Sequence, residues 1–234
     1  MATIHNGHRK RLKDRFSAEG LSHFDDIHIL ELLLFYAVPQ KDTNPIAHAL
    51  LNRFGSLSAV LDARTEDLIA VNGIGESAAV LLRMMPQLMG RYLQDKQSFD
   101  KILTTTTQCG QYLLPRFLSA RDELVYLLML DGKCMVLDCR LIHTGSVNTA
   151  GVSIRKIVEA ALSVNATSVI LAHNHTSGIA LPSAADKATT KKLYEALAAV
   201  DILLADHIVV AGDDFVSLAD DGFFVALQKQ DAES

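Results

Sequence analysis

The period of the hydrophobic pattern changes once along the chain, and this change constrains the fold more than any other feature. Up to about residue 92, apolar residues recur at helical spacing, as in residues 29–34 and 50–61. Later residues alternate between short strand-like runs rich in Leu, Val and Ile and amphipathic helical runs. The strand-like runs are residues 124–130, 135–141, 168–172 and 207–210, and the helical runs are residues 154–164 and 184–200. We therefore predict an α+β protein whose N-terminal part is entirely helical.

A polar, Thr-rich segment at residues 94–107 separates the two patterns and is typical of a linker. We predict a helical domain at residues 1–101, an α/β domain at residues 102–228 and a short tail at residues 229–234. The chain has 234 residues, of which 49% are hydrophobic, so it contains enough apolar material for one or two ordinary cores.

The charge balance argues against a protein that binds nucleic acid over its whole surface. The chain carries 22 basic and 27 acidic residues, a net charge of -5. The first twenty residues are a local exception, with a net charge of +3. Three cysteines are too few for a disulfide framework, and the chain shows neither a secretory signal nor an apolar run long enough to span a membrane. We expect a cytoplasmic protein without a membrane partner.

A glycine turn in the helical part offers a possible DNA contact. Gly73 and Gly75 flank Ile74, and a helix is predicted to start near Glu76. Such a turn presents backbone N–H groups and a helix N-terminus to a phosphate, as in a helix-hairpin-helix, here at about residues 47–92. The alternative is that the glycines only join two core helices, and the net charge of -1 over residues 1–100 supports that alternative.

The strongest chemical signal is a pair of histidines where a strand ends. Side chains alternate along a strand, so His173 and His175 lie on the same side and can reach one metal. The next predicted helix carries Ser183 and Asp186 in its first turn, and Asp186 can supply an oxygen ligand. Taken singly, the serine and aspartate are also typical of a helix cap, and each histidine can be satisfied by backbone.

Two histidines and one carboxylate leave a fourth tetrahedral position open, the pattern of catalytic zinc, so we predict one Zn²⁺ per chain. Zinc would make hydroxide available near neutral pH, and the Ser183 hydroxyl would stabilise the oxyanion that forms on an attacked carbonyl. Iron and manganese also accept this ligand set. His207, next to Asp206 at the start of a late strand, is either a residue that orients the site, a substrate contact or a structural residue.

With these residues in place, the sequence resembles the JAMM motif, His-x-His-x7-Ser-x2-Asp, and more closely the bacterial RadC family of JAB/MPN-fold proteins. The four motif residues match without a gap. The resemblance implies a helix-hairpin-helix domain followed by a JAB/MPN, cytidine-deaminase-like α/β metalloprotease domain. Thr176 replaces the proline usual in the family, and residues 153–156 depart from its usual His-Pro-Arg-Glu, so the substrate preference can differ. Further matches are Gly145, Asn148, Arg155, Ser177, Gly178 and the pair Asp206-His207.

The resemblance also implies a function and a general base. JAMM enzymes use a glutamate upstream of the histidines, and Glu123 matches that context, with Glu159 as a rival. The family implies a metallopeptidase or isopeptidase acting on a peptide or protein substrate. Two alternatives stay open at this point: a DNA-associated repair or recombination factor or nuclease that binds DNA through the helical domain, and a JAB scaffold without activity.

Overall fold

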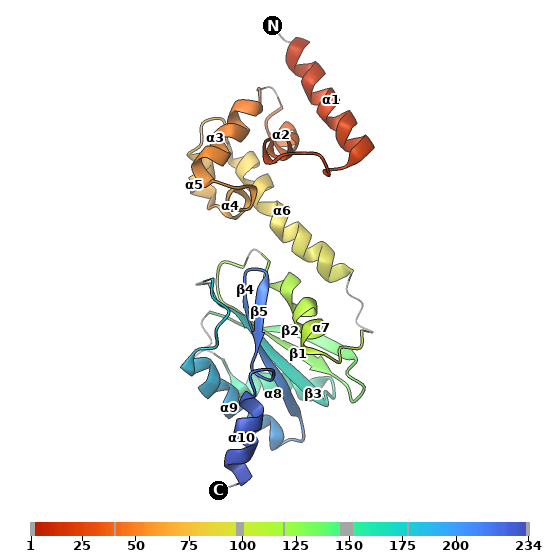
Figure 1. The fold of residues 1–234 in the computed structure, drawn as a ribbon, viewed down its shortest axis with the longest axis vertical. Coiled ribbons are helices and arrows are strands. Elements are labelled where there is room, and N and C mark those ends of the chain that lie inside the picture. The colour runs from red at the N-terminus through yellow and green to blue at the C-terminus, as the bar shows by residue number, and fades with distance from the viewer. Residues whose placement is uncertain are drawn as a thin grey trace. The chain divides into compact units, whose positions relative to one another are not determined.

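The computed structural model describes residues 3–39, 41–96, 101–118, 120–145, 152–176 and 178–232 (Figure 1). Contacts divide the chain into two compact units, Met1–Met89 and Gly90–Ser234. The division falls within one long helix, α6 (Glu76–Asp95), and so precedes the predicted linker. Asn148 and Ser177, which matched the RadC pattern, lie outside the described residues.

The described part of the first unit is helical, as the periodicity predicts. Its core is formed by apolar side chains that the sequence spaces along one face of each helix, among them Leu30, Leu34, Leu50, Leu68 and Leu82, which are fully buried. The helices are α1 (Thr3–Glu19), α2 (Asp26–Ala37), α3 (Asn44–Phe54), α4 (Leu57–Asp62), α5 (Thr65–Ile69) and the first part of α6.

Two arginines of the basic N-terminal segment hold α1 against the rest of the unit. The Arg9 guanidinium donates to the carbonyls of Val38 and Lys41, at 2.7 and 2.6 Å. Arg15 donates to the carbonyl of His23 at 2.5 Å. These carbonyls lie beyond the end of α1 and α2, where no intrahelical donor reaches them. Two of the basic residues of this segment therefore stabilise the fold of the first unit through hydrogen bonds to backbone carbonyls.

The second unit contains a mixed five-stranded sheet. Its strand order is β2-β1-β3-β4-β5, and β3 and β4 are the parallel pair, while the other neighbours are antiparallel. The strands are β1 (Leu124–Leu130), β2 (Val136–Thr144), β3 (Ser168–Asn174), β4 (Leu203–Ala211) and β5 (Asp214–Ser217). The helical elements are α7 (Thr106–Leu113), the short 3-10 helix η1 (Leu114–Arg116), α8 (Ile154–Ser163), α9 (Ala184–Ala198) and α10 (Phe223–Ala232).

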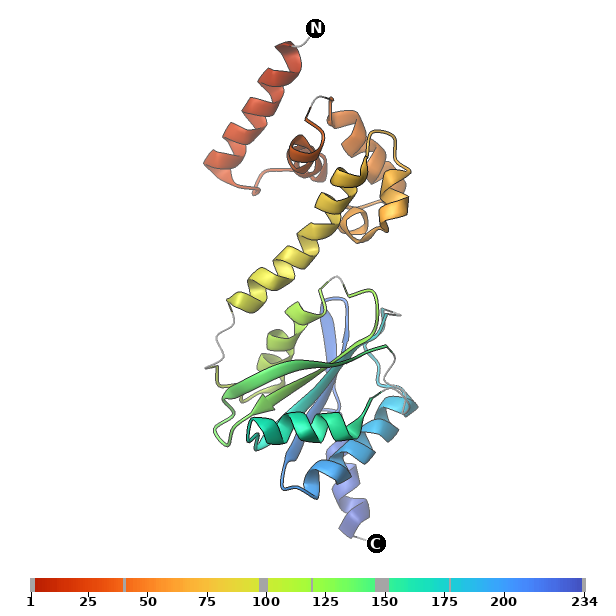
Figure 2. The ribbon, with the colours of Figure 1, turned by 180° about the vertical axis from the view of Figure 1, so that it is seen from behind.

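Helices cover both faces of this sheet. Ile157 of α8 and Leu193 of α9 pack with Leu171 of β3 on one face. Tyr112 of α7 packs with Ile170 of β3 on the other face. Figure 2, the view from behind, shows α8 in front of the sheet. Because β3 is buried along its whole length, any polar side chain on it must be satisfied within the protein.

Three elements of this unit are absent from the prediction. The four-residue strand β5 follows β4 after the two-residue turn at Gly212 and Asp213 and is too short for a period to appear. Helix α7 begins inside the Thr-rich segment, where the Thr105 hydroxyl accepts from the backbone N–H of Gln108. Helix α10 continues through Ala232, into the segment predicted as a tail. None of the described helices combines the length and apolarity that crossing a membrane requires.

Candidate metal centre

The first imidazole lies on the central strand β3, close to the C-terminal end of that strand. His173 is fully buried near the end of β3, between β1 and the parallel strand β4. The backbone N–H of His175 donates to the carbonyl of Val210 at 2.8 Å, so the chain stays alongside β4 one residue past the end of β3. The two-residue period then places both imidazoles on the face that α9 covers.

The start of α9 fixes the carboxylate. Ser183 is the N-cap, and its hydroxyl oxygen accepts from the Asp186 N–H at 3.1 Å. Asp186 Oδ2 accepts in turn from the Ser183 N–H at 2.7 Å and from the Ser183 hydroxyl at 2.6 Å. This reciprocal capping box is the helix-cap alternative of the sequence analysis. It is compatible with a metal site, because both Ser183 hydrogen bonds go to Oδ2 and Oδ1 lies 3.3 Å from His173 Nε2.

These three side chains converge on one point. The Nε2 atoms of His173 and His175 are 2.9 Å apart, and His175 Nε2 lies 3.3 Å from Asp186 Oδ2. All three ligand atoms lie within 4.8 Å of one another, and Asp186 is only 3% exposed. The structure therefore brings together the three residues predicted as metal ligands.

Hydrogen bonds to the other ring nitrogens leave Nε2 of both histidines available. His173 Nδ1 lies 2.8 Å from Nε2 of His207, and His175 Nδ1 lies 3.2 Å from the carbonyl of Ile179. Burial lowers the pKa of His173 to about 4, so this imidazole is neutral at pH 7 and offers a lone pair. Burial raises the pKa of Asp186, but the Ser183 hydrogen bonds and the nearby His173 outweigh it and leave the pKa below its usual value. Two imidazole nitrogens and a carboxylate oxygen suit zinc, iron or manganese.

Comparison with protein-family models shows which family this chain belongs to. Residues 103–223, more than half of the chain, match the RadC-like JAB domain. The chain belongs to the RadC family. The protein is 34% identical to a UPF0758 protein of Pseudoalteromonas translucida over 91% of this chain and 95% of the relative. It is 36% identical to a UPF0758 protein of Burkholderia thailandensis over 90% of this chain and 80% of the relative. The resemblance inferred from the motif is thereby confirmed.

Glu123, predicted as the general base of this RadC-family protein, lies immediately before β1. The β1–β3 register pairs Val125 with His173, so extending it by two residues places Glu123 opposite His175. Asn174 holds this segment in place, because its Oδ1 accepts from the Leu124 N–H at 2.6 Å. Strand alternation then directs Glu123 to the face that carries the imidazoles. Glu123 is half-buried, and its carbonyl accepts from the Gly145 N–H at 2.7 Å.

The rival glutamate points elsewhere. Glu159 lies on α8, where its carboxylate pairs with Arg155 at 2.7 Å and is 59% exposed. The residues of α8 that face the sheet are Ile157, Ala160 and Ala161. Glu159 therefore occupies the solvent side of α8.

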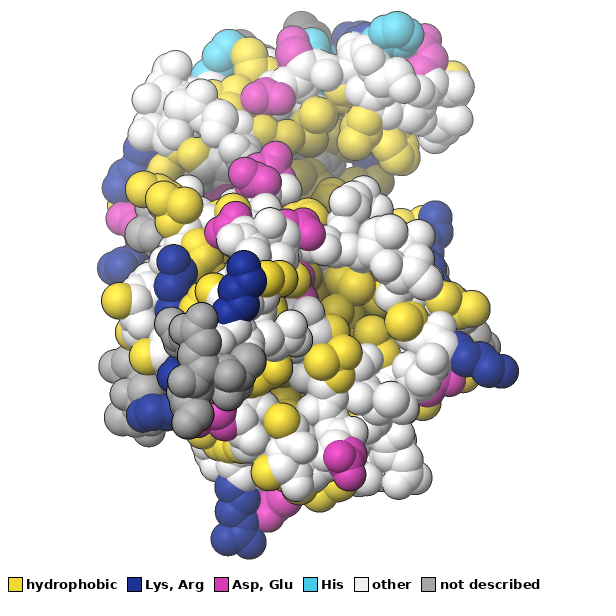
Figure 3. All heavy atoms as spheres, turned by 60° about the horizontal axis from the view of Figure 1, so that its bottom comes forward, with side chains coloured by type: hydrophobic (Ala, Val, Ile, Leu, Met, Phe, Trp, Pro, Cys, Tyr) yellow, Lys and Arg dark blue, Asp and Glu magenta, His cyan; other side chains and the backbone are white. Residues whose placement is uncertain are grey.

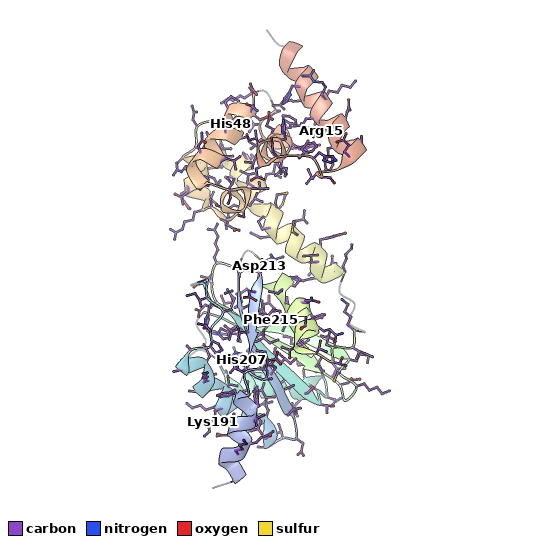
Figure 4. The ribbon with its side chains drawn as sticks, viewed as in Figure 1. Arg15, His48, Lys191, His207, Asp213 and Phe215 are labelled. Atoms are coloured by element: carbon purple, nitrogen blue, oxygen red, sulfur yellow. The ribbon has the colours of Figure 1, made fainter. Side chains whose placement is uncertain are left out.

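His207 is buried in β4, near the middle of the second unit (Figure 4), and its ring is oriented by a residue that sequence reasoning missed. His207 Nδ1 lies 2.6 Å from the hydroxyl of Thr190 on α9. The neighbouring carboxylate of Asp206 accepts instead from the Ser217 hydroxyl and the Ala219 N–H, so it ties β4 to the C-terminal end of β5. Thr190 follows Asp186 by one helical turn, a spacing that could have revealed it.

The glycine turn has a structural explanation at one of its two positions. Gly73 has a φ of +96°, and a Cβ there would lie 2.7 Å from Cδ1 of Ile46. A Cβ on Gly75 would meet no atom within 4 Å. On the helix that follows the turn, Arg83 of α6 donates to the Thr65 hydroxyl at 2.9 Å and so ties α5 to α6. The DNA contacts at Gly73 and Gly75 stay a prediction.

Proposed function

We propose that the C-terminal unit is a zinc-dependent hydrolase of the JAMM class that cleaves a peptide or isopeptide bond. The observation that carries the proposal is the cluster of buried His173 and Asp186 with half-buried His175, whose Nε2 atoms and carboxylate face one another. The nature of the bond rests on the resemblance to JAMM proteins. Membership of the RadC family supports the domain and leaves the substrate open.

The three residues would hold the metal through Nε2 of each histidine and Oδ1 of Asp186. Bound zinc would supply a Lewis acid that lowers the pKa of a water molecule and polarises a carbonyl. The protein contributes rigidity: one ligand lies on a buried strand, and another is fixed by the capping box at the start of α9. Such preorganisation keeps the ligands in place during the reaction.

Glu123 would transfer the proton, and Ser183 would stabilise the negative charge that develops on the oxyanion. Glu123, on the imidazole face, would take a proton from water and pass it to the leaving amine. Ser183 would donate its hydroxyl proton to the oxyanion. This hydroxyl now donates to Asp186 Oδ2, so it must rotate away when substrate arrives. Each role predicts a loss of turnover when the side chain is removed.

The test uses Glu123→Gln with Glu159→Gln as a matched control. Purified full-length protein loaded with zinc would be screened against a peptide library and isopeptide-linked substrates. The proposal predicts cleavage by wild type and by Glu159→Gln, with a loss of about 100-fold or more in Glu123→Gln at unchanged zinc content. Zinc-loaded wild type that cleaves nothing in either set would leave a non-catalytic scaffold.

A second candidate function, DNA binding by the helical unit, is favoured by the turn between α5 and α6. Gly73 and Gly75 immediately precede α6, whose N-terminal N–H groups suit a phosphate. Figure 3 draws mainly the second unit, and on that face the Lys and Arg side chains stand apart from one another. The test is a mobility shift of labelled DNA by the full chain at low and high salt. A shift that weakens steeply with salt supports binding, and no shift at low salt removes it.

A further inference from the structure

A chain of buried hydrogen bonds leads from the candidate metal ligand His173 back to the ligand Asp186. It runs from His173 on β3 to His207 on β4 at 2.8 Å, and from His207 to Thr190 on α9 at 2.6 Å. The Thr190 hydroxyl then donates to the backbone carbonyl of Asp186 at 2.6 Å. His173, His207 and Thr190 are all fully buried. Buried polar groups are costly unless paired, so this arrangement needs an explanation beyond packing.

The Asp186 carbonyl, at the end of this series of hydrogen bonds, determines which atom donates in each of them. A carbonyl oxygen can only accept, so the single hydroxyl proton of Thr190 must point at the Asp186 carbonyl. The Thr190 oxygen has no second proton for His207, and it must therefore accept from Nδ1–H of that ring. The neutral His207 ring carries one proton, which leaves its Nε2 as an acceptor. A fully buried ring whose nitrogens meet an imidazole and a hydroxyl, and not a carboxylate, is neutral.

The same reasoning fixes His173. His207 Nε2 has no proton, so His173 must donate from Nδ1 across the 2.8 Å separation. Neutral His173 is then in the Nδ1–H tautomer, and its Nε2 carries a lone pair. That Nε2 is the atom that faces His175 and Asp186. Thr190, on the helix α9, thus determines that Nε2 of His173 carries no proton.

We propose that Thr190 and His207 are positioning residues that lock His173 in the Nδ1–H tautomer, so that its Nε2 is ready to bind the metal. This inference rests on the proposed metal centre. Hydrogen bonds behind a ligating histidine fix its tautomer and ring orientation, and their loss costs about 10- to 100-fold in metal affinity. Thr190 also lies one turn beyond Asp186 on α9, so one hydroxyl couples the imidazole ligand to the helix that carries the carboxylate ligand.

Removing the hydroxyl should reverse the tautomers. In Thr190→Val the Nδ1–H of His207 has no acceptor, so the proton is better placed on Nε2, where it can be donated to His173 Nδ1. His173 would then carry its own proton on Nε2, the atom that the metal needs. Thr190→Ser keeps the hydroxyl and should restore the wild-type tautomers. Ser217→Ala removes a buried hydroxyl from Asp206, next to His207, and serves as a control for lost stability.

The first measurement reads tautomers in the metal-free full chain, from long-range proton–nitrogen NMR correlations of isotope-labelled histidine. We expect Nδ1–H for His173 and His207 in wild type, Thr190→Ser and Ser217→Ala, and a change to Nε2–H in Thr190→Val. An Nε2–H tautomer for His173 in wild type would overturn the inference. This readout needs neither metal nor activity, and wild type alone suffices if a variant fails to fold.

The second measurement is zinc affinity by competition with a chromophoric chelator. We expect Thr190→Val to bind zinc about 10- to 100-fold more weakly than wild type, and Thr190→Ser and Ser217→Ala to bind it with near wild-type affinity. Equal affinity in wild type and Thr190→Val would overturn the positioning role while leaving the proposed hydrolase intact. Wild type that binds no zinc would instead remove the proposed function. The NMR measurement of the tautomers would still test whether Thr190 and His207 fix the proton on Nδ1 of His173.

Discussion

The Nε2 atoms of His173 and His175 face one another at 2.9 Å, while the Nδ1 atoms of both rings are hydrogen-bonded elsewhere. Two lone pairs at that separation repel unless a proton or a metal lies between them. The carboxylate of Asp186, 3.3 Å from each Nε2, supplies the negative charge that a cation would neutralise. This relationship is the structural basis for the proposed metal centre.

The stability of the metal-free protein should fall as the pH falls below about 6.5. Burial lowers the pKa of His173 to about 4 and that of His207 to about 3, whereas both titrate near 6.5 in the unfolded chain. Between pH 6.5 and 4 the unfolded state therefore binds protons that the native state does not. The free energy of unfolding should drop by about 1.4 kcal/mol per pH unit for each histidine.

Urea unfolding of chelator-treated protein over that pH range measures this slope. A free energy of unfolding that stays constant from about pH 6.5 to 5 would contradict the buried, neutral state of both rings.

Zinc should stabilise the folded protein, because a site formed by β3 and α9 is absent from the unfolded chain. Zinc at about one hundred times its dissociation constant should add about 2.7 kcal/mol to the free energy of unfolding. Thermal unfolding with and without zinc measures the effect, with His175→Ala as the comparison. An equal rise in the melting temperature of wild type and His175→Ala would place the bound zinc elsewhere.

Ser183→Ala should separate the capping role from the catalytic role. Loss of the capping box should cost about 1 kcal/mol of stability, seen as a lower urea midpoint. Thr105→Ala removes the N-cap of α7 in the same unit and should cost a similar amount. If Ser183 also stabilises the oxyanion, only Ser183→Ala loses turnover as well. Equal turnover in the two variants, both folded, would reduce Ser183 to a helix cap.

Gly73→Ala and Gly75→Ala should differ although the glycines are two positions apart. Gly73 has a positive φ and contacts Ile46, so a Cβ there adds about 1–2 kcal/mol of backbone strain and a clash. Gly75 has open space, so the alanine should change stability by about 0.5 kcal/mol or less. Urea midpoints of the two variants measure the difference, and equal midpoints would contradict the packing at Ile46.

The part of the site that the sequence predicts depends on local rules. The two-residue period of a strand places His173 and His175 on one face, and the spacing of Ser183 and Asp186 marks the start of a helix. Each rule acts within a few residues. These groups could therefore be named before any fold was known.

The remaining residues of the site depend on which strands and helices become neighbours. Thr190 meets His207 only because α9 packs across β4, and Glu123 approaches His175 only because β1 pairs with β3. No local period encodes these contacts. The sheet order is non-local in the same sense, since β1 lies between β2 and β3 and the short β5 closes one edge. The single change of hydrophobic period at the linker predicts the fold class, but it does not predict the order of the strands in the sheet.

The most direct test of the metal centre is the metal content of full-length protein purified without a His tag or chelator, measured by mass spectrometry. The variants are His175→Ala and Asp186→Ala, with Glu159→Gln as the control on the solvent side of α8. The account predicts about one zinc per chain in wild type and Glu159→Gln, and its loss in both ligand variants. Wild type that holds no metal even after zinc is supplied would contradict the account.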